Sequence, residues 1–299
     1  FERQKTERLS KRTEYIELRN KMQEIKNKYP NVRLYIAIKA LSLKEKMLLI
    51  HIKKDLLELI QVLKSQQLLT CFDNEYVEKR VEVPLDKEVS VTFMGYIDKI
   101  MYYKNIDDTY FSIIDYKTGS IDTHLEPMKY GLHMQLPVYL YLIHYGKVFD
   151  NPIFTGIYYQ NILFPYPTWS LKLEKEKKER YYLQGYSTDN ISLLERFDST
   201  YQESNYIRSM KYSDEKGFGT YSKIMDDDML YQMVEYTKKM ISKKTNEILE
   251  GDFTINPKIY NMENISCRFC SFKDLCYHTE KDSIYLDKVE DLSFLGGEE

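Results

Sequence analysis

The sequence predicts an α/β protein in which long helices accompany a β-sheet, followed by a cysteine-rich C-terminal segment. Residues 41–66 and 226–250 carry apolar residues with a helical period. Between them, residues 75–85, 90–103 and 110–119 are rich in β-branched and aromatic side chains, which favour strands. We therefore expect helices around a sheet.

The N-terminal region, residues 1–70, is predicted to be helical. Residues 1–29 are charged and lack a strong apolar stripe, so we expect an exposed helix that is broken at Pro30. The opening residues are polar and contain no secretory signal. Because the sequence begins with Phe1 and not with methionine, we expect it to be a fragment of a longer protein.

The central region, residues 71–250, begins with the three β-rich runs, which turns containing Asp and Asn separate. We expect three successive strands of a mainly antiparallel sheet. Residues 130–147 then predict a helix, in which Pro137 is tolerated only within the first turn. A strand is expected over residues 153–163, and a charge-rich strand or helix over residues 171–186.

Composition limits the classes of protein that this chain can be. Of its 299 residues, 43% are hydrophobic and 30% are charged, as in ordinary soluble proteins. The longest apolar run, residues 136–143, is too short to span a bilayer, so no membrane association is expected. The net charge of −3 argues against capture of nucleic acid by a broad basic surface. No Gly-x4-Gly-Lys-Ser/Thr pattern occurs, so the chain has no nucleotide-driven motor of its own.

An acid and a base stand two positions apart in "SIIDYKTGS", residues 112–120. Side chains at i and i+2 of a strand share a face, so Asp115 and Lys117 project together. The chain holds four acid-x-Lys triplets, but only this one follows an apolar run and precedes a Thr-Gly turn. The pair is either a surface ion pair or part of a metal site for phosphodiester cleavage.

Neighbouring residues favour the metal site. Asp98, in "GYIDKI", lies on the preceding predicted strand, so hairpin pairing brings its carboxylate toward Asp115. Two adjacent carboxylates repel unless a divalent cation joins them, and Mg²⁺ accepts one or two carboxylates plus waters. Lys117 can orient the attacking water or stabilise phosphoryl charge. Gln135 and Tyr139, one helical turn apart, would face the site together.

These motifs resemble a known family. The series "GYIDKI…IIDYKTGS…HMQLPVYLY" is similar to the PD-(D/E)XK nucleases of the RecB/AddB type. The C-terminal "ILEGDFTINPKIYNMENISCRFCSFKDLCYH" resembles the end of the AddB-type nuclease, and together the likeness covers roughly residues 75–278. The resemblance implies a restriction-endonuclease-like core, with a mixed central sheet flanked by helices, that hydrolyses DNA with a divalent metal.

The resemblance also implies roles for residues of the acidic site. Asp98 and Asp115 would ligate Mg²⁺ or Mn²⁺, together with the main-chain carbonyl of Tyr116. Lys117 would position the water nucleophile.

Further positions carry over from the same family. Gln135, with Tyr139 beside it, would contact the DNA backbone or order the site. The acid that the family has on its first strand corresponds to Glu78, with Glu82 as the second choice. The family's histidine on an earlier helix would be His51, whose apolar setting is also typical of an ordinary buried or edge helix position.

The cysteine-rich segment, residues 251–299, contains three cysteines within ten residues. Cys267, Cys270 and Cys276 in a polar stretch indicate a metal and a reducing compartment, the cytoplasm. One reading is tetrahedral zinc with His278 as the fourth ligand, although Cys276 and His278 are closer in sequence than zinc motifs normally place them.

The resemblance implies the other reading, in which these cysteines are three ligands of a [4Fe–4S] cluster. The fourth ligand would then be Cys71, the only other cysteine of the chain, or a residue upstream of Phe1.

The implied function is the nuclease domain of a helicase–nuclease that resects double-strand breaks, cutting single-stranded DNA supplied by a helicase partner subunit. A first alternative is a stand-alone iron–sulfur exonuclease, whose basic groove would use Lys172, Lys175, Lys177, Lys178 and Arg180, although interleaved glutamates also suit a solvated face. The others are a non-catalytic clamp on DNA or a partner, and a zinc-stabilised interaction module. A clamp would be expected to lack a catalytic acid or the lysine.

Overall fold

The computed structural model describes residues 43–86, 90–162, 179–268 and 270–296. The chain divides into two compact parts, residues 1–51 and 52–299. The predicted helix over residues 1–29 and Lys172, Lys175, Lys177 and Lys178 lie outside the described residues. The predicted second helix is confirmed as α2, Leu43–Gln67. The three predicted regions, residues 1–70, 71–250 and 251–299, stay a prediction.

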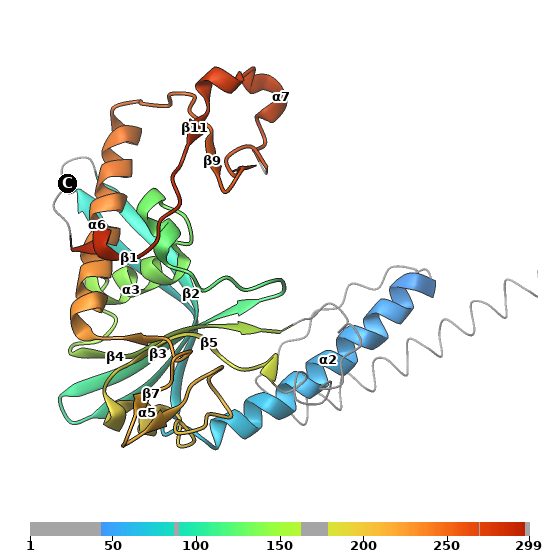
Figure 1. The fold of residues 1–299 in the computed structure, drawn as a ribbon, viewed down its shortest axis with the longest axis vertical. Helices are drawn as coiled ribbons and strands as arrows, with labels where there is room; N and C mark the ends of the chain where they lie inside the picture. The colour runs from blue at the N-terminus through green and yellow to red at the C-terminus, as the bar shows by residue number, and fades with distance from the viewer. Residues whose placement is uncertain (1–42, 87–89, 163–178, 269, 297–299) are drawn as a thin grey trace, which may run out of the picture. The chain divides into compact units, whose positions relative to one another are not determined.

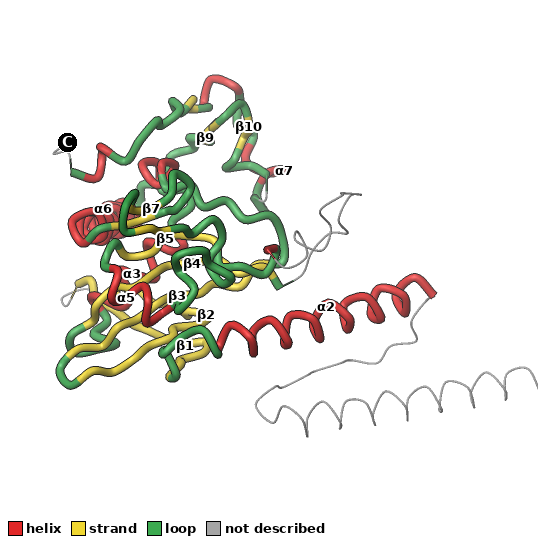
Figure 2. The backbone as a smooth tube through the Cα atoms, turned by 60° about the horizontal axis from the view of Figure 1, so that its bottom comes forward, coloured by secondary structure: helices red, strands yellow, loops and turns green. Residues whose placement is uncertain are grey.

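A six-stranded mixed sheet forms the centre of the second part (Figure 1). The three predicted antiparallel strands are confirmed, and the next strand pairs parallel to the third. Figure 2 shows the first five strands side by side in chain order. The strands, in sheet order, are β1 (Asn74–Asp86), β2 (Val91–Asn105), β3 (Asp108–Lys117), β4 (Pro152–Asn161), β5 (Gln184–Thr188) and β8 (Ile224–Met225).

Helices α3 (Gln135–Tyr145) and α6 (Asp227–Leu249) pack on one face of this sheet. The predicted helix over residues 130–147 is shorter than expected, because a 3-10 turn, η1 (Glu126–Tyr130), ends at Gly131 with a left-handed φ of 76°. Since α3 begins at Gln135, Pro137 falls in the first turn, where a missing backbone N–H costs little. Side chains of α3, α6 and strands β1 to β4 contribute to this core.

A second core lies on the opposite face and contains α5 (Ile191–Phe197). Its centre is the Tyr158 ring of β4, which stacks on Phe197 with centroids 5.5 Å apart. Strand β4 is therefore buried on both faces, as strands of parallel pairs usually are.

Short elements complete the described chain. Of the predicted element over residues 171–186, the described part is a turn followed by the start of β5 at Gln184. Within the described residues no helix is long and apolar enough to cross a membrane. The remaining elements are β6 (Tyr212–Ser213), β7 (Gly217–Phe218), β9 (Lys258–Tyr260), β10 (Glu263–Asn264), α7 (Lys273–Cys276), η2 (Glu280–Asp282), β11 (Ile284–Tyr285) and η3 (Ser293–Leu295).

Candidate active site

The site is built on the end of β3, where an apolar strand finishes in charged residues. Ile113 packs into the core beneath α3, and Ile114 packs into the core on the other face. The alternation of a strand therefore places Asp115 on the α3 side, where it is fully buried. Burying a carboxylate is costly unless hydrogen bonds and a cation compensate it.

Three side chains surround the Asp115 carboxylate. The Lys117 ammonium lies 2.7 Å from Oδ2. On Oδ1, the Gln135 amide donates a hydrogen bond of 2.6 Å and the Tyr139 hydroxyl donates one of 3.2 Å. The structure thus brings together four of the predicted site residues.

Helix α3 supplies the two polar partners from its first turns. Gln135 and Tyr139 are four residues apart on one helical face, and the Gln135 amide also donates to the Tyr139 hydroxyl at 3.0 Å. Seven of the eleven residues of α3 are buried, so these two side chains are held by a helix fixed in the core. Tyr139 itself is only 7% exposed.

Lys117 is enclosed on three sides. Its ammonium contacts Asp115, donates a hydrogen bond to the Gln135 carbonyl oxygen, and lies 4.9 Å from the centre of the Tyr159 ring. Tyr159 stands opposite Asp115 in the parallel pairing of β3 with β4. A cation over an aromatic face is attracted by the ring quadrupole. Tyr159 therefore belongs to the site, although the sequence did not identify it.

Asp98 reaches the same place from β2. The antiparallel pairing of β2 with β3 ends with Lys99 opposite Ile114, and Asp98 and Asp115 are the next residues beyond that pair. The Asp98 carboxylate accepts a hydrogen bond of 3.1 Å from the Tyr116 backbone N–H. Hairpin pairing therefore places the Asp98 side chain beside Tyr116, the residue that follows Asp115.

Glu78 is the candidate acid of β1, the strand on the other side of β2. The pairs Val77 with Lys99 and Lys79 with Ile97 leave Glu78 opposite Asp98. Its φ of 50° lies in the left-handed region that non-glycine residues rarely adopt. The alternative, Glu82, lies opposite Met94 and pairs with Arg80 on the exposed surface.

The alternation of side chains between the two faces of the sheet is interrupted at Glu78 and Asp98. On β2, Ile97 packs in the same core as Ile100, three residues later, and on β1 Tyr76 packs in the same core as Val81. Regular strands send alternate residues to one face. Glu78 and Asp98 therefore lie within a local irregularity of the first hairpin.

Electrostatics distinguish Asp115 from ordinary carboxyls. Burial raises the pKa of Asp115 above its usual value, and the nearby negative charge of Asp98 raises it further. The Lys117 ammonium and the Tyr139 hydroxyl lower this pKa by stabilising the charged form, but burial is the largest effect. A desolvated carboxyl with a specific charge partner is typical of functional sites.

The oxygen donors of the site suit a hard divalent cation. Asp115 Oδ2 is buried and lies 2.7 Å from the Lys117 ammonium. No group of three or more His, Cys, Asp or Glu side chains placed to hold a metal occurs in the described ranges. Mg²⁺ needs only one or two carboxylates beside water and substrate oxygens, so Asp98 and Asp115 fit it.

The cysteines are not gathered into a metal site in the described part of the chain. Cys267 Sγ lies 3.7 Å from the His278 Nε2 atom. Cys270 is exposed and Cys276 is half-buried at the end of α7. Cys71 is exposed at the beginning of the segment that leads into β1, where its N–H donates to the Arg196 carbonyl of α5.

His51 and Arg180 are the remaining candidates from the sequence. His51 is a half-buried residue of α2, and it ends the first compact part, so its role stays a prediction. Arg180, suggested for a basic groove, pairs with Glu58 at 2.8 Å.

Comparison with known proteins agrees with the geometry. Residues 4–277 match the PD-(D/E)XK nuclease superfamily. An ATP-dependent helicase/deoxyribonuclease subunit from Carboxydothermus hydrogenoformans is 30% identical over 203 residues, which cover 65% of this chain and 18% of the relative. The protein of the same name from Clostridium tetani is 28% identical over 207 residues, or 66% of this chain and 18% of the relative. The chain thus spans less than a fifth of the length of these relatives. With the match extending over most of its length, the chain belongs to the PD-(D/E)XK nuclease superfamily.

Proposed function

We propose that this chain is the DNA-cleaving domain of a helicase–nuclease and that it hydrolyses phosphodiester bonds with Mg²⁺ or Mn²⁺. The observation that carries the proposal is the fully buried Asp115 carboxylate with Lys117, Gln135 and Tyr139 on it. Burying a carboxylate lowers the stability of the fold, and such perturbed carboxyls are concentrated at functional sites, where they take part in the reaction.

Each side chain has a chemical task in this proposal. Asp98, Asp115 and the main-chain carbonyl of Tyr116 would hold the divalent ion, which when bound supplies Lewis-acid polarisation of the phosphoryl group. Lys117 would orient the attacking water and stabilise charge on the phosphoryl oxygens through its ammonium.

Supporting residues fix that lysine. Gln135 holds the ammonium through its carbonyl oxygen, while its amide and the Tyr139 hydroxyl hold Asp115. Glu78 would join the site as the acid of the first strand, and the pairing of its neighbours, Val77 with Lys99 and Lys79 with Ile97, supports this.

The proposed substrate is single-stranded DNA, cut from an end and delivered by a helicase partner subunit. The names of the relatives combine helicase and deoxyribonuclease, and this chain matches only a small part of their length. A net charge of −3 suits a domain that receives DNA from a partner better than one that captures it alone.

We also propose that Cys267, Cys270 and Cys276 hold a [4Fe–4S] cluster, with Cys71 or a residue upstream of Phe1 as the fourth ligand. Thiolates at close spacing are the ligands that such clusters use. Zinc held by the same cysteines and His278 is the alternative, and the proximity of Cys267 to His278 is the observation that supports it.

The test is cleavage of end-labelled single-stranded DNA with Mg²⁺ or Mn²⁺ by wild-type protein and Lys117→Ala. We expect a loss of about 10²–10³-fold in rate, the size typical of removing one donor to developing charge. Lys244→Ala is the matched control, because Lys244 pairs with Glu247 on the surface of α6.

The assay is run on the chain alone and together with a helicase partner subunit. Metal-independent cutting, or cutting that survives Lys117→Ala, would refute the proposed chemistry. Binding of DNA without cutting in both settings would leave the clamp as the function.

A further inference from the structure

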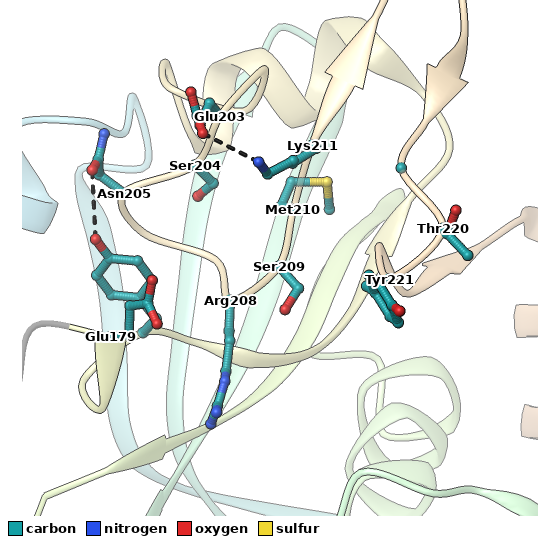
Figure 3. A pocket seen from close by; sticks show the side chains of 12 residues that line it. Glu179, Glu203, Ser204, Asn205, Arg208, Ser209, Met210, Lys211, Thr220 and Tyr221 are labelled. Atoms are coloured by element: carbon teal, nitrogen blue, oxygen red, sulfur yellow. Dashed lines mark hydrogen bonds and ion pairs between the residues drawn. The ribbon is translucent and has the colours of Figure 1, made fainter. Parts of the chain in front are cut away.

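A cavity of about 810 Å³ lies beside the beginning of β5 (Figure 3), and neither Asp98 nor Asp115 is among the residues that line it. It is formed mainly by the residues before β5 and by the loop that follows α5. Hydroxyl, amide and charged groups dominate its lining, and the side chains used below are Tyr182, Arg208, Tyr221 and Glu179.

The sheet connects this cavity to the active site. Asp115 on β3 lies opposite Tyr159 on β4, and Tyr159 lies opposite Gln184 on β5. Residues paired in this way share a face of the sheet. The Arg208 guanidinium donates a hydrogen bond of 3.1 Å to the Gln184 side-chain oxygen. Asp115, Tyr159, Gln184 and Arg208 therefore form a row across the sheet, with the carboxylate at one end and Arg208 at the other.

The row gives the spacing between the two places. Two strand-to-strand steps lead from Asp115 to Gln184 and amount to about 10 Å, and Arg208 lies beyond Gln184, on the backbone segment that pairs with Leu183. A stacked DNA strand advances by about 3.4 Å per nucleotide, so this distance corresponds to about three nucleotides.

The cavity combines a cation with accessible aromatic rings. Arg208 is exposed, and in Figure 3 its side chain extends away from Glu203 and Lys211, which pair with each other at 3.2 Å. Tyr221 is 82% exposed, and the Tyr182 ring also lines the cavity. Arginine suits phosphate, and exposed tyrosine rings suit unpaired bases.

We propose that this cavity is a subsite for one nucleotide of single-stranded DNA, about three or more nucleotides from the bond that is cut. Arg208 binds the phosphate and Tyr221 stacks on the base. A base can enter the cavity only when it is unpaired, so the subsite selects single strands. The inference deepens the proposed nuclease function and rests on it for the position of the cut bond.

The test measures the affinity of the full chain for fluorescein-labelled oligo-dT of two, four and eight nucleotides, with EDTA present so that no cutting occurs. Wild-type protein is expected to bind the eight-mer much more tightly than the two-mer. Arg208→Ala is expected to weaken eight-mer binding about tenfold and to reduce the salt slope of log K by about 0.7, the value for one lost phosphate contact.

The other variants separate stacking from charge. Tyr221→Ala is expected to weaken eight-mer binding about tenfold with an unchanged salt slope, whereas Tyr221→Phe retains the affinity. Glu179→Gln removes a negative charge from the lining and is expected to strengthen binding. Lys244→Ala is the control. Because Arg208 and Tyr221 are exposed, their truncation leaves the core unchanged.

The subsite is wrong if Arg208→Ala and Tyr221→Ala both bind the eight-mer as wild type does, or if the two-mer binds as tightly as the eight-mer. When the wild-type chain cuts DNA under those outcomes, the nuclease function stands and only the subsite fails. When the variants lose affinity and the wild type does not cut with a metal, either alone or with a helicase partner subunit, the subsite stands and the nuclease function fails.

Discussion

The Lys117 ammonium lies 2.7 Å from the buried carboxylate of Asp115, two residues earlier on the same strand. Adjacent strand residues would face opposite ways, so the single intervening residue is what puts the acid and the base in one site. Tyr116, that residue, uses its backbone N–H to hold Asp98. Three consecutive residues therefore organise both carboxylates and the lysine.

Asp115→Asn is expected to raise the melting temperature at neutral pH while abolishing cleavage. Because burial raises the pKa of Asp115, the folded protein binds this proton more tightly than the unfolded chain. Stability then falls as pH rises from the usual carboxyl pKa to the raised one, and the charged form stays unfavourable above it. Melting temperatures at pH 7.5 and pH 4 check this, with exposed Asp214→Asn as control. An Asn variant less stable than wild type at pH 7.5 would contradict it.

Tyr139→Phe removes a hydroxyl that donates to Asp115 and accepts from Gln135. We expect a loss of about 1–2 kcal/mol in the free energy of unfolding. Since the lost bond favoured the charged carboxyl, the acid limb of the cleavage pH profile should move to higher pH. Tyr145→Phe is the control on the same helix, because its hydroxyl bonds to Glu235. Equal pH profiles for the two variants would argue against the role of Tyr139.

Tyr159→Leu is expected to lower the cleavage rate about fivefold, because the ring under the Lys117 ammonium contributes about 1 kcal/mol at a partly exposed site. Tyr159→Phe keeps the aromatic face and should cut at nearly the wild-type rate. Rates at saturating DNA check this. If both variants lose activity equally, the hydroxyl and not the ring is responsible.

Leu142→Ala tests how much the packing of α3 against the sheet stabilises the protein. Leu142 is fully buried, and truncating it should cost about 3 kcal/mol. A methyl group added at Gly95 would come within 2.6 Å of Leu142 Cδ1, so Gly95→Ala alone should also destabilise. Together the two changes should cost less than their sum, because the new methyl enters the space that Leu142 leaves. The free energies of unfolding of wild type, the two single variants and the double variant are measured in urea. If the effects of the two changes simply add, the predicted contact is refuted.

The cysteine segment gives a prediction about metal content. Cys270→Ser should abolish the visible absorbance of anaerobically purified protein if a [4Fe–4S] cluster is bound, while His278→Ala should leave it unchanged. Iron, sulfide and zinc are measured on the same samples. Colourless protein that contains zinc, lost in His278→Ala, would establish the alternative site.

Local sequence patterns were sufficient for much of this site. The apolar run before Asp115, its i+2 spacing to Lys117, and the i+4 spacing of Gln135 and Tyr139 all follow from periodicity within one element. Asp98 needed one further step, the pairing of two consecutive strands.

Features that depend on register between distant strands escaped prediction. Tyr159 faces Lys117 only because β4 pairs parallel with β3 in a particular register. The left-handed φ of Glu78 and the loop carrying Arg208 have no periodic pattern in the sequence. The spacing of the cysteines indicates a ligand set, but it does not fix the positions of the thiols.

The burial of α3 also bears on how this protein can diverge. A substitution that alters Gln135 or Tyr139 acts on a helix in which seven of eleven residues belong to the core, so variation there risks the whole fold. The exposed loop that carries Arg208 has no such restriction. Under the proposed roles, the residues that cleave DNA and the residues that choose the substrate lie in parts of the molecule that tolerate mutation very differently, so substrate choice could change while cleavage is retained.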